Sequence, residues 1–580
     1  MELFMHSNLP IIISDSVREG LYRWRLKMVS EINCIGDKNM LYKINNKNQM
    51  MSTKKWCFLC IMLLVGFSSC KKSGDLQIDP YAGGKEPLGI RFSNSLPKPA
   101  SGASGIDVVY QITGLVPYKD KIKCYLNETE ATVTEVTDKA IKLKVPVGAS
   151  SGGLTIVIDG QIFFGPEFTV SGKTGIDPTF KTLIGTNGVI NQIMPLNNGN
   201  MMLMGYFTDY EKSTSKKIPI SGIVLTSPDG QYIPTAAFGT GAGGGLTSMV
   251  RLANGQYMVG GAFSTFNNRK SIGNITRLNA NGSLDSTIVE VVNLTPLQPK
   301  NSFDTVAAFN GALMGPVSRV FSYNNKVIAV GGFGSYYEHF YERSTRDTKV
   351  LGFTEMGNLL RMEPSGALDL TYNYNPATKT SYERPNGYFY DAAMQSDGKV
   401  VIVGAFTKFQ GIGANNIVRV DNNGMVDPSF QAVADGAIVA IRYNSTTGKY
   451  LICGAFKTFN GKPANGVAMM NSNGTIDESF SLGKLEGGSI GFAAQLSDGK
   501  ILVSGTFNKY NDVVRQGFMI LNANGTLAEG YNNTGMFEGI VNDIYETTSP
   551  LGFPAVVVVG YISKFDNKAA GNIVRFILRP

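Results

Sequence analysis

Hydrophobic and polar positions alternate with a period of two over two short runs near the start of the chain. In residues 137–160, Ile141 and Leu143 alternate with lysines, and a second run follows at residues 154–158. A period of two with one apolar face is typical of strands whose other face meets water. A similar run lies at residues 105–115. The sequence therefore predicts an immunoglobulin-like β-sandwich for residues 89–172.

A different pattern begins at Asp177 and repeats to the end of the chain. Each unit contains a turn, a short hydrophobic run and the tripeptide Gly-x-Phe. Successive tripeptides are separated by 56, 70, 73, 50, 51 and 55 residues. A period near fifty residues indicates a solenoid or a propeller. The tripeptides are Gly205-Tyr206-Phe207, Gly261-Ala262-Phe263, Gly331-Gly332-Phe333, Gly404-Ala405-Phe406, Gly454-Ala455-Phe456, Gly505-Thr506-Phe507 and the degraded Gly560-Tyr561-Ile562.

Each unit contains four strand-like segments, here called A to D. In the fifth unit they are residues 436–444, 449–456, 466–471 and 475–480, and Asn473-Gly474 favours a tight hairpin between C and D. Four antiparallel strands form one propeller blade, so seven units predict a seven-bladed β-propeller over residues 173–580. In each blade we expect Gly404 and its equivalents to let neighbouring blades approach, and Phe406 and its equivalents to fill the gap. The predicted fold class is all-β.

The two ends of the array predict a closed ring. The last unit stops after segment C, whereas residues 175–180 (GIDPTF) match segment D of other units, such as residues 424–430 (GMVDPSF). The early segment would therefore complete the last blade. A solenoid needs no such exchange.

These residues resemble two known families. The turn, the Gly-x-Phe core and the segments such as 424–430 resemble delta-sixty repeats, which are thought to form propellers and have no settled chemistry. Residues 137–160 resemble the TIG (IPT) immunoglobulin-like domain, which usually acts as a spacer in bacterial surface proteins. No binding residue follows from either resemblance.

The first 88 residues predict an anchored envelope protein. Lys54 and Lys55 precede an apolar stretch at 56–67 and then Cys70, which is the order of a signal peptide over residues 51–69. The segment resembles a Bacteroidetes lipoprotein leader, so Cys70 would carry lipid; the alternative is a cleaved signal with an incidental Cys. Residues 70–88 would be a tether. Residues 1–50 fit no domain, so they are a start placed too early or a disordered extension. The expected location is the outer membrane.

Composition excludes several chemistries. Beyond residue 69 the chain has 44 Lys and Arg against 40 Asp and Glu, with no basic block, which argues against nucleic acid. After the leader one His remains, His339, which argues against His-ligated metals and Ser-His-Asp triads. Cys124 and Cys453 lie in different predicted domains, so we expect no disulfide framework. No metal and no cofactor are expected.

Three long insertions interrupt the regular units. They are a B–C loop at residues 334–357 and D–A loops at 287–315 and 371–387, two loop classes that share one face of a propeller. Function concentrates in such loops, and exposed aromatic side chains with polar neighbours suit sugar rings or peptides. The alternative is that these side chains pack the loops against the blades. The candidate ligand-binding residues are Tyr336, Tyr337, His339, Phe340, Tyr341, Arg343, Tyr382, Arg384, Tyr388 and Tyr390.

The sequence supports three functions to different degrees. The first is a lipid-anchored envelope protein whose loop face binds a polysaccharide or another envelope protein. The second is a glycan hydrolase or lyase, for which Glu338, Glu342, Asp347 and Glu383 are available, but their spacing matches no motif. The third is a purely structural envelope protein.

Overall fold

A computed structural model describes residues 86–213 and 219–580. The leader, the proposed lipidation site Cys70 and nearly all of the tether lie outside these residues. The first domain is an all-β unit with strand order β1-β3-β6-β5-β4-β7-β8-β2. Its strands are β1 (Arg91–Phe92), β2 (Ser101–Gly102), β3 (Asp107–Thr113), β4 (Lys123–Leu126), β5 (Thr129–Val136), β6 (Ala140–Lys144), β7 (Gly152–Ile158) and β8 (Gln161–Val170).

Strand β5 connects the two halves of this domain. Its first residues pair with β4 and its residues from Thr132 onward pair with β6, with a register shift between Val133 and Glu135 in the second pairing. The halves share one hydrophobic core. Ile141 and Leu143 are fully buried in it, as the alternating pattern predicts.

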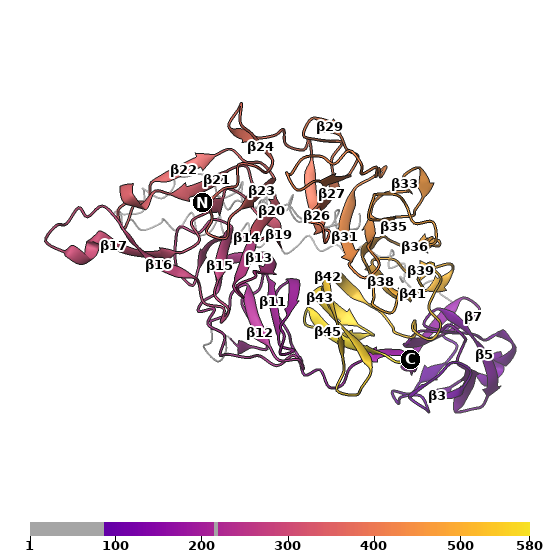
Figure 1. Ribbon diagram of the computed structural model, residues 1–580. Helices are drawn as coiled ribbons and strands as arrows, with labels where there is room; N and C mark the ends of the chain where they lie inside the picture. The colour runs from indigo at the N-terminus through magenta and orange to yellow at the C-terminus, as the bar shows by residue number, and fades with distance from the viewer. Residues whose placement is uncertain (1–85, 214–218) are drawn as a thin grey trace, which may run out of the picture. The chain divides into compact units, whose positions relative to one another are not determined.

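The rest of the chain forms repeated sheets of three antiparallel strands that follow segments A, B and C (Figure 1). The count of seven blades stays a prediction of the repeat. We number the blades 1 to 7 in chain order. Blade 1 contains β10 (Ile190–Pro195), β11 (Met201–Gly205) and β12 (Ile223–Thr226); blade 2 contains β13 (Ala242–Arg251), β14 (Tyr257–Phe266) and β15 (Ile275–Leu278); blade 3 contains β19 (Val317–Tyr323), β20 (Lys326–Gly331) and β23 (Leu359–Met362). Blade 4 contains β26 (Tyr388–Met394), β27 (Val400–Ala405) and β30 (Ile417–Val420); blade 5 contains β31 (Ile438–Asn444), β32 (Lys449–Gly454) and β35 (Val467–Asn471). Blade 6 contains β37 (Ile490–Gln495), β38 (Ile501–Gly505) and β41 (Phe518–Leu521); blade 7 contains β42 (Glu538–Thr548), β43 (Pro554–Phe565) and β45 (Ile573–Leu578).

The prediction of a full fourth strand is wrong for blades 1 to 6. Segment D there returns to segment C through a single bridge, such as Val420 with Val426. The Asp427 carboxylate then accepts hydrogen bonds from the backbone N–H and the hydroxyl of Ser429. Such side-chain bonds compete with a strand ladder, and Pro428 has no N–H to donate. Segment D is therefore a turn.

Ring closure is confirmed. Strand β9 (Thr174–Ile176) pairs antiparallel with β45, so residues from before blade 1 complete the sheet of blade 7. Ile190 and Ile193 of blade 1 share a hydrophobic cluster with Val557 and Val559 of blade 7. Figure 1 shows β45, in yellow, beside β11 and β12. We call the contact between blades 7 and 1 the seam.

The Gly of Gly-x-Phe has a role that the sequence did not predict. A Cβ on Gly404 would lie 1.9 Å from the carbonyl oxygen of Tyr388, which belongs to strand A of the same blade. The expectation that this Gly lets neighbouring blades approach is therefore wrong. The close approach coincides with a β-bulge in strand A of blade 4, between Phe389 and Asp391. Strand A of each of the other blades has a register shift at the matching position. Phe406 is buried as expected.

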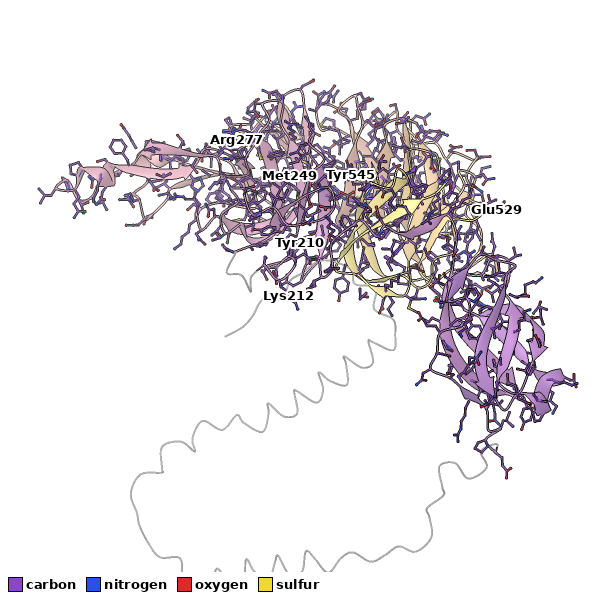
Figure 2. All side chains as sticks on the ribbon, turned by 90° about the horizontal axis from the view of Figure 1, so that it is seen from below. Tyr210, Lys212, Met249, Arg277, Glu529 and Tyr545 are labelled. Atoms are coloured by element: carbon purple, nitrogen blue, oxygen red, sulfur yellow. The ribbon has the colours of Figure 1, made fainter. Side chains whose placement is uncertain are left out.

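A repeated ion pair, which we call the Arg–Asp staple, joins segments C and D in four blades. Arg419 Nε donates to Asp427 Oδ2 at 3.0 Å, and Arg419 Nη1 donates to the carbonyl oxygen of Ser472 in the next blade at 2.6 Å. Each staple therefore also links two blades. The pairs are Arg277–Asp285, Arg361–Asp369, Arg419–Asp427 and Arg575–Asp177, and Figure 2 labels Arg277.

The first domain bonds directly to the propeller. The Ser151 backbone N–H donates to the carbonyl oxygen of Asn533 at 2.9 Å, and Asn533 Nδ2 donates to the carbonyl oxygens of Val170 and Thr174. Residues 171–173 alone separate β8 from β9. A short connection and buried hydrogen bonds hold the two domains together.

Candidate functional site

The B–C insertion of blade 3 contacts both of the other insertions, and their common face stays a prediction of the blade topology. The B–C insertion of blade 3 contains a hairpin of β21 (Tyr336–His339) and β22 (Leu351–Thr354). Glu355 directly follows this hairpin, and its carbonyl oxygen accepts a hydrogen bond from the N–H of Ser381, which belongs to the insertion before blade 4. The insertion before blade 3 adds β18 (Ala312–Leu313) to the same sheet.

A second hairpin belongs to the insertion before blade 3. Its strands are β16 (Ser286–Glu290) and β17 (Phe303–Ala307), which project from the blades in Figure 1. Lys349 Nζ donates to Asp304 Oδ2 at 2.8 Å, so this hairpin is tied to the first. We call the two hairpins together, residues 286–307 and 336–354, the arm.

Two of the ten candidate residues are buried inside the arm. Tyr336 donates its hydroxyl to the carbonyl oxygen of Gly366 at 2.8 Å. His339 is enclosed by Asn310, whose side chain bonds to both the backbone and the ring of His339. Burial and the nearby Lys349 hold the pKa of His339 below its usual value. Because both side chains are buried, they support the arm from within and offer little surface to a ligand, which corrects their placement among the ligand-binding residues.

Alternate residues of β21 and the next turn form a row of rings. His339 and Tyr341 stack with centroids 5.5 Å apart, and Tyr337 meets His339 edge-on at 5.8 Å. Across the hairpin, Tyr337 lies 5.8 Å from the ring of Phe353. The buried His339 therefore positions two half-buried tyrosines, and the exposed end of the row is Phe353.

The remaining candidates lie at the edges of the arm. The Arg343 guanidinium lies 4.8 Å from the ring centre of Phe340. Arg384 Nη2 donates to the carbonyl oxygen of Gly334 at 2.7 Å, so it ties two insertions together. Tyr388 is exposed at the start of β26. Two further candidates are half-buried, namely Tyr382 in the third insertion and Tyr390 at the bulge of β26.

A groove with a volume of about 490 Å³ separates the arm from blade 2. Its arm side consists of Tyr337, Leu351 and Phe353, and its opposite side includes Phe263 and Ser264 from the end of β14. A cleft with aromatic walls and a few polar groups is the usual form of a ligand site. The other lining residues are Gly243, Ala262, Ile272, Gly273, Asn274, Leu313, Met314 and Gly315.

Glycine makes room for this groove at one position. A Cβ on Gly273 would lie 2.2 Å from the Tyr337 hydroxyl oxygen. The next residue, Asn274, has φ +63° and donates its amide to the carbonyl oxygen of Leu313 at 2.8 Å. The backbone of blade 2 thereby fixes the base of the arm and the ring of Tyr337.

The sequence predicted Tyr337 and missed four exposed contributors to this face. Phe353 and Met314 were overlooked because they stand outside the runs of tyrosine. Tyr206 and Tyr561 were overlooked because they belong to the repeat itself, yet they are the aromatic residues at the middle position of Gly-x-Phe. Both are exposed, and an aromatic residue at that position was the available signal.

Charged side chains gather instead on the innermost strands. Arg319 Nε and Arg442 Nη1 both donate to the Asp391 carboxylate, at 2.6 Å each. Burial opposes ionisation of Asp391, but the two arginines outweigh it and hold its pKa below the usual value. For Asp543, burial outweighs Arg442 and Arg319, so its pKa is raised. The two arginines therefore balance the Asp391 carboxylate, whereas Asp543 accepts hydrogen bonds from the backbone N–H groups of Ile193 and Ile544.

The described residues contain two free cysteines, Cys124 and Cys453, both buried. Burial raises the pKa of each thiol to about 12. Across residues 86–213 and 219–580, no helix is long and apolar enough to cross a bilayer. The same part of the chain brings together no metal-ligand cluster of three or more His, Cys, Asp or Glu.

Two families match parts of the chain. Residues 64–166 match "Domain of unknown function (DUF5008)". Residues 252–287, 395–430, 446–480 and 496–527 match "Domain of unknown function (DUF5122) beta-propeller". The chain therefore carries both domains, and the resemblance of the first to TIG (IPT) domains stays an expectation. No curated protein matches the chain.

Solved structures with similar folds share little sequence with the chain. The WD40 beta propeller domain of Doa1 is 14% identical over 70% of this chain and 96% of that one, with a TM-score of 0.38. An auxiliary nutrient binding protein from Bacteroides thetaiotaomicron VPI-5482 is 10% identical (83% and 98% covered, TM-score 0.24). One from Bacteroides ovatus ATCC 8483 is 11% identical (85% and 98% covered, TM-score 0.25).

Proposed function

We propose that this protein is a lipid-anchored component of the cell envelope whose arm and second blade bind a polysaccharide. The observation that carries the proposal is the groove between the end of β14 and the arm, whose aromatic wall is the half-buried Tyr337 and the exposed Phe353. Aromatic rings offer large apolar faces at a low entropic cost, and the backbone and Ser264 supply polar groups at the edge.

The groove supports binding rather than hydrolysis. Glycosidases place two carboxyl groups on either side of the scissile bond. Among the described residues that line the groove there is no Asp or Glu. Glu338, Glu342, Asp347 and Glu383, the acids considered for catalysis, are not part of this lining.

The groove proposal is tested by binding to a glycan array and by calorimetry with the glycans that bind. Phe353→Ala should weaken binding by about 1–3 kcal/mol, because it removes an exposed ring at the groove wall. Phe164→Ala is the control, since Phe164 is also an exposed phenylalanine (78% against 57% for Phe353) and lies on β8 of the first domain. Equal affinity of the Phe353 variant and wild type for every bound glycan would place the site elsewhere.

The anchor proposal has its own experiment. Cys70→Ala should move the protein from the membrane fraction to the soluble fraction or stall its processing, because the proposed lipid attaches to the thiol. Labelling with a fatty-acid analogue reports the same step directly. Equal labelling of wild type and the variant would exclude lipidation at Cys70 and would leave the groove proposal intact.

A further inference from the structure

The middle residue of Gly-x-Phe marks a second part of the loop face. This residue lies at or near the end of strand B and directly precedes the buried core residue, so its side chain points away from that core position. In blades 1 and 7 it is a tyrosine, Tyr206 and Tyr561, with 41% and 60% of the residue exposed. In the other units it is small, namely Ala262, Gly332, Ala405, Ala455 and Thr506.

Tyr206 occupies a place prepared for it on the next blade. A Cβ on Gly245 of blade 2 would lie 2.0 Å from the ring of Tyr206. The ring of Tyr206 therefore occupies the space that a side chain larger than glycine would need at position 245. Burial of part of the ring raises the pKa of its hydroxyl. A ring held against a backbone with its remaining surface in water is a fixed platform.

Tyr561 stands at the same register one blade away. Tyr561 pairs with Ile540 on strand A of its blade, and Ile540 is also exposed. The equivalent partner of Tyr206 in blade 1 is Val189, whose carbonyl oxygen accepts a hydrogen bond from the Tyr206 N–H. The seam joins the two blades here, because Asn572 Nδ2 donates to the carbonyl oxygen of Gly188 at 3.0 Å. Tyr561 therefore lies on the blade next to that of Tyr206, at the matching position, with 60% of the residue exposed.

Tyr206 contacts the strand of blade 2 whose neighbouring residues line the groove. Gly243, two residues before Gly245, and Ala262, the residue of blade 2 that matches Tyr206, both line it. Apolar and aromatic contact points thus follow one another from the arm across blades 2, 1 and 7.

The described residues that line the groove carry no charge of their own. The described residues lining the groove include no Lys, Arg, His, Asp or Glu. Near Tyr561, Lys564 and Glu538 form an ion pair at 3.4 Å, so their charges offset each other. An acidic polymer would need cationic partners, which the described residues of the groove lining do not supply.

We propose that the loop face binds an extended, neutral polysaccharide that lies in the groove and continues across Tyr206 to Tyr561. This inference rests on the proposed function and adds the charge class and the length of the ligand. A polymer that contacts several fixed rings gains affinity with each one, because the sites are linked within one ligand.

The repeat supplies substitutions that the fold accepts. Tyr206→Ala and Tyr561→Ala introduce the residue that blades 2, 4 and 5 already have at this position. Neither change removes a core side chain or a backbone hydrogen bond. Phe164→Ala on the first domain again serves as the control for loss of an exposed ring.

The experiment uses native affinity electrophoresis of the full chain carrying Cys70→Ala, so that no lipid is present. The neutral probes are laminarin, mannan, galactan and amylopectin, and the acidic probes are alginate, polygalacturonate and heparin. We expect at least one neutral probe to retard the protein, and little change between about 0.05 M and 0.5 M salt. Each Tyr→Ala change should weaken binding of that polymer about tenfold, which is about 1.4 kcal/mol. A di- or trisaccharide cut from it should bind wild type and both variants equally.

The outcomes separate this inference from the proposed function. If Phe353→Ala weakens binding of the polymer and the two tyrosine variants do not, the groove stands and the path across the seam is wrong. Binding of acidic probes alone, or binding lost at high salt, overturns the neutral class. If wild type is retarded by none of the probes, both proposals fail.

Discussion

Replacing Arg575 with Ile tests whether the Arg–Asp staple at the seam stabilises the closed ring. Arg575 lies on the last strand, and Asp177 follows β9 at the start of the propeller. Arg575 Nε donates to Asp177 Oδ2 at 2.7 Å, and Nη1 donates to the carbonyl oxygen of Pro228 in blade 1 at 2.6 Å. The two side chains are 2% and 0% exposed. The substitution leaves a carboxylate buried without its cation.

The magnitude follows from this burial. Removing one partner of a buried ion pair costs about 3–5 kcal/mol, because the other charge stays in the interior. Asp177 keeps its hydrogen bonds from the N–H and hydroxyl of Thr179, which favours the lower half of that range. Arg277→Ile breaks the equivalent staple of blade 2, where the side chains are 15% and 17% exposed. Water reaches that carboxylate, so we expect a smaller cost of about 1–2 kcal/mol.

Blade 6 supplies the rescue variant. Ile520 and Ala528 occupy the positions of the staple there, and the N–H of Ala528 bonds to the carbonyl oxygen of Ile520 as Asp177 does to Arg575. Both residues are buried. Adding Asp177→Ala to Arg575→Ile should therefore recover about 2 kcal/mol, because no charge remains buried.

Urea unfolding followed by far-UV circular dichroism measures these differences as shifts in the midpoint at constant slope. Hydrogen bonds from Thr179 and Ser549, together with Arg575, outweigh burial and hold the pKa of Asp177 below its usual value. Its contribution is therefore complete above about pH 4 and is lost as the pH falls below that. If Arg575→Ile costs no more than Arg277→Ile, or if the double variant is no more stable than the single one, the buried charge is not the cause.

Two further predictions concern the ring and the thiols. Deleting residues 175–180 should lower the melting temperature in calorimetry and increase light scattering, because β45 loses its partner and becomes an exposed edge; an unchanged melting temperature would indicate that the ring does not depend on this strand. Cys124 and Cys453 should resist a thiol reagent at pH 8 in the native protein and react after unfolding, because burial raises both pKa values to about 12; rapid native labelling of either peptide in mass spectra would contradict this.

The sequence predicted the strands of the repeat well for a physical reason. Segments A to C are short hydrophobic runs between turns, so their pattern determines their structure. Segment D also contains apolar residues, but the Asp427 carboxylate accepts hydrogen bonds from the N–H and the hydroxyl of Ser429, and no ladder forms. The sequence also could not show which backbone approaches Gly404. That depends on a bulge in strand A, and a bulge has no composition of its own.

The candidate site was predicted at the level of the insertions and less well at the level of residues. Tyr336 and Tyr337 are neighbours on β21, and a strand directs neighbours to opposite faces. One is therefore buried beneath the arm and the other lines the groove. Which face would be covered depends on how β18 and β22 pair with β21, and these pairs join segments far apart in the sequence.

Departures from a regular repeat are more informative about function than the repeat itself. Where blades share a residue, as with the buried Phe of Gly-x-Phe, the shared packing explains it. The blade fold does not require Tyr206 and Tyr561, since alanine serves the same position in three other blades, and each tyrosine leaves apolar surface in water. The arm likewise adds residues that no blade needs. These departures from the repeat are the reason that we propose a ligand for this part of the surface.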